Sequence, residues 1–243
     1  MRGLPQQPNL RVIACEAVAE ELRSLLPAQV DCQVFDFGLR VNPNGLTHAL
    51  QEAIDDIPAS IKAVSLGYGL CSQAVAGLRS NQATLIVPRV DDCIGIFLGS
   101  HEAYRRQAAT SPGTYYLTKG WIEAANGLFA EYDQLVARYG EDRAAWLMDK
   151  MLAGYTRLAL INTGQYNLDR YRSYARKTAE RFNLCYEEIM GSTALLRKLV
   201  RGPWDEDFVV VPPGRAITVS HFRETAAASS AGPETDPIRP GKE

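Results

Sequence analysis

The distribution of apolar residues along the chain is the feature that most constrains its fold. Short apolar runs, typical of buried strands, alternate with amphipathic segments whose apolar residues recur at helical spacing. Strands that alternate with helices in this way form parallel sheets with helices packed against them. The sequence therefore predicts an α/β fold of the Rossmann-like, doubly wound kind.

The alternation occurs in two stretches with similar element lengths and order, residues 11–66 and 157–211. We interpret them as two pseudo-repeated βαβαβ halves that flank a cleft, with one continuous sheet as the alternative. In either arrangement, ligands are expected beyond the carboxyl ends of the strands. The predicted strands are 11–14, 32–37, 63–66, 84–87, 157–161, 185–189 and 208–211, and the predicted helices include 16–26, 93–109, 168–182 and 192–200.

Composition shifts along the chain predict its division into segments. The last segment is rich in Pro and Ser and poor in large apolar residues, which is typical of disorder. The expected segments are a flexible leader (1–10), an N-terminal α/β half (11–110), a loop and helical connector (111–153), a C-terminal α/β half (154–223) and a disordered tail (224–243).

Composition and charge exclude several classes of function. The chain of 243 residues is 46% hydrophobic and 22% charged, as in ordinary globular proteins. A net charge of −2 and the lack of any Lys or Arg cluster argue against nucleic acid as a partner. No run approaches the roughly 20 apolar residues of a membrane span, so we expect no membrane partner. Residues 1–5 lack a signal-peptide core, which predicts a cytoplasmic protein.

The five cysteines give the strongest indication of a site. Cys15, Cys71 and Cys93 follow the first, third and fourth predicted strands, whereas Cys32 and Cys185 begin strands and belong to the opposite edge. In the usual right-handed order the third strand lies between the first and the fourth, about 4.8 Å from each. The turns after these strands can therefore bring three sulfur atoms together.

Three thiols at one edge suit a zinc ion with one open position, or a [4Fe-4S] cluster whose fourth ligand comes from elsewhere. Cys93 and Cys15 also lie at predicted helix N-termini, where the helix dipole favours the thiolate form that binds metal. The alternative is simple packing, because cysteine is among the most buried residue types and these three form no Cys-x-x-Cys pair.

Other residues at the same edge are candidates for chemistry and ligand binding. Acids next to the cysteines either stabilise the first turns of helices or serve as general base or carboxylate ligand; they are Glu16, Asp91 and Asp92. Loop aromatics suit a small-molecule pocket, and the candidate substrate-binding residues are Tyr68, Arg89, Tyr115 and Tyr166. Arg89 precedes the acidic pair, which it either neutralises or leaves free while it binds an anionic ligand.

Four motifs in order resemble the bacterial and archaeal family known as domain of unknown function 1638, over about residues 10–220. They are Val12-Ile13-Ala14-Cys15-Glu16, Leu66-Gly67-Tyr68-Gly69-Leu70-Cys71-Ser72, Pro88-Arg89-Val90-Asp91-Asp92-Cys93-Ile94 with Leu98-Gly99-Ser100, and Pro112-Gly113-Thr114-Tyr115-Tyr116-Leu117-Thr118.

The resemblance implies a shared cysteine site, because the family's motifs retain the three cysteines. It also implies a link with one-carbon metabolism, since such proteins accompany corrinoid-dependent methyltransferase systems; a corrinoid protein or a methyltransferase is the implied partner. The residue that matches Asp91 is commonly histidine in the family, which leaves the fourth ligand or acid–base group open here.

Three hypotheses follow for the function. The first is a zinc or iron–sulfur protein that acts on or senses a small molecule linked to methyl transfer, with a metal-dependent reaction as one possibility. The second is a metal-free small-molecule-binding or accessory protein that partners a methyltransferase. The third is an enzyme with Cys71 or Cys93 as nucleophile, which is least favoured because no base adjoins either residue.

Overall fold

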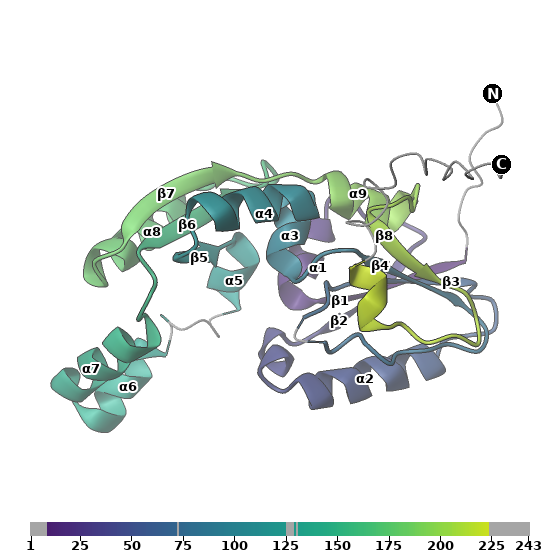
Figure 1. The fold of residues 1–243 in the computed structure, drawn as a ribbon, viewed down its shortest axis with the longest axis horizontal. Helices are drawn as coiled ribbons and strands as arrows, with labels where there is room; N and C mark the ends of the chain where they lie inside the picture. Colours follow the sequence, from purple (N-terminus) through teal and green to yellow (C-terminus); the bar gives the residue numbers. More distant parts are fainter. Residues whose placement is uncertain (1–8, 72, 125–128, 130, 224–243) are drawn as a thin grey trace, which may run out of the picture.

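The computed structural model describes residues 9–71, 73–124, 129 and 131–223. Residues 1–8 of the predicted leader and the whole predicted tail lie outside the described residues. The described chain forms two lobes, each built on its own sheet, and Figure 1 shows them side by side. The predicted Rossmann-like α/β fold is thus confirmed, with two separate sheets in place of one continuous sheet.

The first lobe contains a five-stranded sheet whose first four strands are parallel. In spatial order the strands are β2 (Asp31–Phe35), β1 (Leu10–Cys15), β3 (Ala63–Gly67), β4 (Thr84–Pro88) and β8 (Phe208–Val211). The third strand in the chain lies between the first and the fourth, as predicted. The central strands are continuous apolar runs because helices cover both faces of the sheet.

The second lobe contains a three-stranded parallel sheet, in the order β5 (Thr114–Leu117), β6 (Arg157–Asn162) and β7 (Cys185–Met190). The sequence analysis placed residues 114–117 in a loop, but they pair with β6 and form a strand. The strand at 208–211 was expected in the second half, yet β8 pairs antiparallel with β4 in the first sheet. Val209 and Val211 are buried there, which fixes this pairing.

Helices cover the sheets and connect the lobes. They are α1 (Glu16–Leu22), η1 (Phe37–Val41), α2 (Pro43–Asp55), α3 (Cys93–Leu98), α4 (His101–Thr110), α5 (Lys119–Glu123), α6 (Tyr132–Tyr139), α7 (Glu141–Met151), α8 (Asp169–Arg181), α9 (Ala194–Arg201) and η2 (Val219–Phe222).

The single helix predicted at 93–109 is two helices, α3 and α4. Gly99 ends α3 in the left-handed region at φ +86°. The Ser100 side chain then accepts a hydrogen bond from the Ala103 N–H at 3.0 Å and begins α4. A left-handed glycine followed by a serine cap is a common way to stop one helix and start another.

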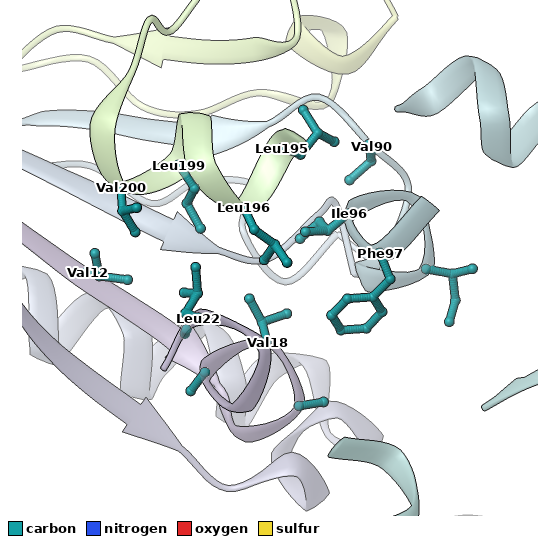
Figure 2. Packing of buried hydrophobic residues seen from close by; sticks show 14 of the residues in the cluster. Val12, Val18, Leu22, Val90, Ile96, Phe97, Leu195, Leu196, Leu199 and Val200 are labelled. Atoms are coloured by element: carbon teal, nitrogen blue, oxygen red, sulfur yellow. The ribbon is translucent and has the colours of Figure 1, made fainter. Parts of the chain in front are cut away.

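Helix α9 ties the second part of the chain to the first sheet. Leu195, Leu196 and Leu199 on this helix are buried, and Figure 2 shows them facing apolar residues of β1, α1 and α3. The Ser65 hydroxyl of β3 also donates to the Leu199 carbonyl at 2.7 Å. Burial of apolar side chains from both lobes in one cluster holds the carboxyl ends of the first sheet in place.

Candidate functional site

The three cysteines that follow strands lie around one cavity in the first lobe. Cys15 is the last residue of β1 and precedes α1, Cys71 lies in the turn after β3, and Cys93 is the first residue of α3. Cys32 and Cys185 lie near the starts of β2 and β7, at the opposite ends of their strands. The parallel order of β1, β3 and β4 is what brings the three cysteines together.

Glycines allow the turn after β3 to approach its neighbours closely. A Cβ on Gly67 would lie 2.6 Å from the Ala14 Cβ, and one on Gly69 would lie 2.7 Å from the Val90 carbonyl oxygen. With both side chains absent, the Cys71 N–H donates to the Asp91 carbonyl at 2.8 Å. The Gly-x-Gly pair thus serves backbone approach, which places Cys71 beside the turn that leads to Cys93.

Burial controls the ionisation of the three thiols. It raises the pKa of Cys15 to about 11 and that of Cys71 to about 12, and it raises the pKa of Cys93 well above its ordinary 9.0. Repulsion from a Cys15 thiolate raises the pKa values of Cys71 and Cys93 further, so the three sulfur atoms interact electrostatically.

The lowering of thiol pKa that was expected from a helix N-terminus is present at Cys15 but is the smaller effect. The backbone N–H groups of Val18 and Ala17, at the start of α1, favour the Cys15 thiolate, and the charge of Arg40 does the same. Desolvation outweighs them, because little water reaches the thiol. The helix N-terminus thus favours the Cys15 thiolate as expected, but burial sets the net direction of the pKa shift.

The cavity is small and mainly apolar. It offers about 40 Å³ to a water-sized sphere, whereas a single water needs roughly 10–15 Å³ by the same measure. Organic ligands occupy pockets of about 300–1,000 Å³. The space among the thiols thus suits an ion or a few waters, and an organic ligand would have to bind at its mouth. Besides the cysteines, the lining residues are Asp36, Phe37, Arg40, Leu46, Gly67 and Tyr68.

Hydrogen-bond donors without acceptors surround the thiols. The Tyr68 side chain lines the cavity at 2% exposure, and its hydroxyl has no partner among the described residues. The Trp121 indole N–H makes no well-formed hydrogen bond in the described chain, but it lies close enough to Cys93 to favour the thiolate. Buried polar groups without partners are rare in folded proteins and call for an explanation.

The three acids predicted beside the cysteines lie outside the cavity lining. Glu16 is exposed at the start of α1. Asp91 is also exposed, with its carboxylate 3.8 Å from the His101 ring. Asp92 caps α3, since its side chain accepts from the Ile94 N–H at 2.8 Å, and burial raises its pKa. The Asp92 charge also contributes to the raised pKa values of Cys71 and Cys93.

The predicted substrate-binding residues separate in the structure. Tyr68 lines the cavity, whereas Arg89 donates to the carbonyls of Glu206, Phe208 and His221 and so holds the C-terminal segment against β4. These contacts correspond neither to neutralisation of Asp91 and Asp92 nor to the binding of an anionic ligand, the two roles predicted for Arg89.

Tyr115 and Tyr166 are not among the residues that line the cysteine cavity. Tyr115 lies on β5, with its ring 4.8 Å from that of Phe129 and 6.1 Å from that of Trp121. Tyr166 follows β6 and accepts a hydrogen bond from the Lys119 backbone N–H at 3.2 Å. Lys119 in turn pairs with Glu20 of α1 at 2.6 Å, so this polar cluster connects the two lobes.

Sequence reasoning missed Phe37 and Arg40 in η1. The Arg40 guanidinium lies 4.3 Å from the centre of the Phe37 ring and 4.9 Å from that of Trp121. The predicted strand at 32–37 includes Phe37, but β2 ends at Phe35 and Phe37 begins η1. The contact with Trp121 spans both lobes, so no local signal marked Phe37 or Arg40 as part of the site.

Across the residues that the structure describes, no group of three or more His, Cys, Asp and Glu side chains is arranged to hold a metal ion. The thiols share a cavity without forming a ready-made set of ligands. Within the same residues, no helix has the length and apolar character needed to cross a membrane.

Comparison with known protein families relates the chain to one of them. A family model described as "Protein of unknown function (DUF1638)" matches residues 34–200, a range that includes Cys71 and Cys93 and begins after Cys15. No curated protein and no solved structure matches the chain significantly.

Proposed function

The chain belongs to the DUF1638 family, and we propose that it is a cysteine-ligated metalloprotein in which Cys15, Cys71 and Cys93 hold a zinc ion or an iron–sulfur cluster. The centre acts on or senses a small molecule linked to one-carbon, corrinoid-dependent methyl transfer. The observation that carries the proposal is the shared cavity: three half-buried cysteines from three separate strand ends line a space of about 40 Å³.

The electrostatics of the cavity support a cation among the thiols. Without one, burial and mutual repulsion keep the thiols protonated, as the raised pKa values of Cys15 and Cys71 indicate. A bound metal ion favours deprotonation of coordinating thiols. The cysteine side chains would have to turn toward a common centre when a metal binds, because the described residues hold no ready-made set of metal ligands.

Two hydrogen-bond donors without partners among the described residues also favour ionised cysteines in the cavity. Thiolate sulfur is a stronger acceptor than a neutral thiol, so the hydroxyl of Tyr68 and the indole N–H of Trp121 would gain acceptors when the cysteines ionise. Hydrogen bonds of this kind orient metal ligands and tune the metal. The small cavity favours a single zinc ion over a [4Fe-4S] cluster, which needs room for its sulfide atoms as well as its irons.

The metal and two neighbouring side chains, Asp92 and Tyr68, would have different roles in the chemistry. When bound, zinc with one open position supplies a Lewis acid that activates a thiol or water, and a cluster supplies electron transfer or Lewis acidity. Asp92, whose pKa is raised by burial, is placed to hold a proton near Cys93. Tyr68, whose side chain lines the cavity, would help to orient the cysteine thiolates through its hydroxyl.

A metal-free binding or accessory protein that partners a methyltransferase is the second candidate. The observation that favours it is the lack of a ready-made set of metal ligands among the described residues. In that case the three thiols are packing residues, and the two lobes provide the surface that binds a ligand or partner.

Elemental analysis and a visible spectrum of the full chain, purified without oxygen, test the proposal. We expect about one zinc per chain, or iron with a broad visible absorption, and loss of the metal when Cys15, Cys71 or Cys93 is replaced by serine. Cys32→Ser and Cys185→Ser are matched controls that should keep the metal. A metal-free protein, or equal metal loss in the controls, would overturn the metal site in favour of the second candidate.

A further inference from the structure

Arg40 lies where the cysteine cavity opens to solvent. Most side chains that line the cavity are buried or half-buried, whereas Arg40 and Asp36 are exposed and therefore mark its mouth. The rings of Phe37 and Trp121 lie against the guanidinium at 4.3 and 4.9 Å. Stacking on two aromatic rings fixes the position of a charge that would otherwise move freely on a long side chain.

This fixed charge has no counterion in the described part of the chain. The other charged residue at the mouth, Asp36, accepts a hydrogen bond from the Gly38 N–H at 2.7 Å and forms no ion pair with Arg40 among the described residues. An arginine held rigidly at a cavity mouth without an acid is a recognition group for an anion.

Charge balance at the proposed metal site also favours the binding of an anion by Arg40. Three thiolates around a divalent zinc leave a net negative centre, so a further anionic ligand needs a cation nearby in a cavity with little water. Arg40 is the cation that lines this cavity. The cavity itself holds only an ion or a few waters, so the charged end of an organic ligand must stay at the mouth.

We propose that the mouth of the cysteine cavity binds a small organic anion, whose carboxylate pairs with Arg40 while its second donor, a thiol, points toward the cysteines. The direction of that second donor rests on the proposed metal centre. The pairing with Arg40 rests only on the geometry of the mouth, so the two can fail separately.

Calorimetric titration of the full chain with two thiols of similar size tests the pairing. Mercaptoacetate carries a carboxylate and 2-mercaptoethanol carries a neutral hydroxyl. Zinc-loaded wild-type protein should bind mercaptoacetate about two- to fivefold more tightly, since an exposed charge pair contributes up to about 1 kcal/mol to affinity. Raised salt should reduce this preference, because Arg40 is exposed.

Variants assign the preference to Arg40. Arg40→Gln should abolish it, and Arg40→Lys should keep part of it, because the charge remains while the planar guanidinium is lost. Arg143→Gln is the matched control: this arginine also stacks on a tryptophan, 4.8 Å from the Trp146 ring, but lies on α7 in the second lobe (Figure 1). It should leave the preference unchanged.

The titrations distinguish failure of the anion site from failure of the metal site. Equal affinity for the two thiols in metal-loaded wild-type protein overturns the anion site and leaves the metal site standing. If the chain holds no metal, the same titrations are run on the metal-free protein: a mercaptoacetate preference that Arg40→Gln removes supports the anion site alone, and no preference overturns it. An unchanged preference in folded Arg40→Gln and Arg40→Lys proteins also overturns it.

Discussion

Gly69→Ala tests how the fold brings Cys71 and Cys93 together. The new Cβ would lie 2.7 Å from the Val90 carbonyl oxygen, 2.8 Å from the Asp92 nitrogen and 2.9 Å from the Asp92 Cα. All three atoms belong to the backbone, which no side-chain rotation can move. The turn after β3 must therefore separate from the turn after β4.

Two backbone hydrogen bonds join these turns, from the Leu70 N–H to the Val90 carbonyl and from the Cys71 N–H to the Asp91 carbonyl, each 2.8 Å long. Overpacking a tight site costs about 1–3 kcal/mol, and each hydrogen bond contributes about 0.5–1.5 kcal/mol. We therefore expect Gly69→Ala to lower the free energy of unfolding by about 2–4 kcal/mol, and to reduce zinc binding because Cys71 shifts away from Cys93.

Urea unfolding followed by circular dichroism, together with zinc content after reconstitution, measures both effects. Gly140→Ala is the control, because this glycine at φ +78° lies between α6 and α7, and a Cβ at this position would have no other atom within 4 Å. At φ +78° and ψ 164° its backbone conformation is essentially restricted to glycine, so Gly140→Ala should cost about 1–3 kcal/mol through backbone strain but keep its zinc. Gly69→Ala protein with wild-type stability and full zinc content would refute the reasoning.

Three further predictions concern residues around the site and between the lobes. Asp92→Ala should lose about 1 kcal/mol of unfolding free energy with the helix cap, whereas Asp92→Asn should keep it; equal unfolding midpoints in urea would contradict the capping role. Burial raises the pKa of Glu21 above 4.5, so its ionisation opposes folding; stability should fall as pH rises above that value, less steeply in Glu21→Gln, and parallel pH profiles would contradict this. Arg89→Gln should cost about 2–3 kcal/mol and speed proteolysis near residues 206–222, because Arg89 holds that segment through three carbonyls; an unchanged digestion pattern would refute that role.

Local pattern was sufficient to predict most strands but not all of their partners. Strands β1, β3 and β4 are short apolar runs, and parallel strands covered on both faces always read in this way. β8 is an equally apolar run, but nothing in its residues says which sheet it joins. Its pairing with β4 depends on contacts between distant segments, which include the burial of Val209 and Val211 and the hydrogen bonds of Arg89.

At the candidate site, too, local sequence was sufficient for some features but did not reveal contacts between distant segments. Strand order and chain direction were enough to predict that Cys15, Cys71 and Cys93 lie at one sheet edge, because parallel strands end on the same side. The net rise of the thiol pKa values could not be predicted in the same way, because burial depends on what packs over the cysteines and not on their position at helix starts. Arg40 escaped notice for a related reason: its significance comes from Trp121, a residue of the other lobe.

X-ray absorption at the metal edge of the anaerobically purified chain tests the central claim most directly, because it counts the sulfur atoms bound to the metal. We predict three sulfur ligands, at about 2.3 Å if the metal is zinc, and fewer in Cys71→Ser protein that retains metal. A spectrum with only nitrogen and oxygen ligands, or one that is identical in wild-type and Cys71→Ser protein, would contradict a centre held by the three cysteines.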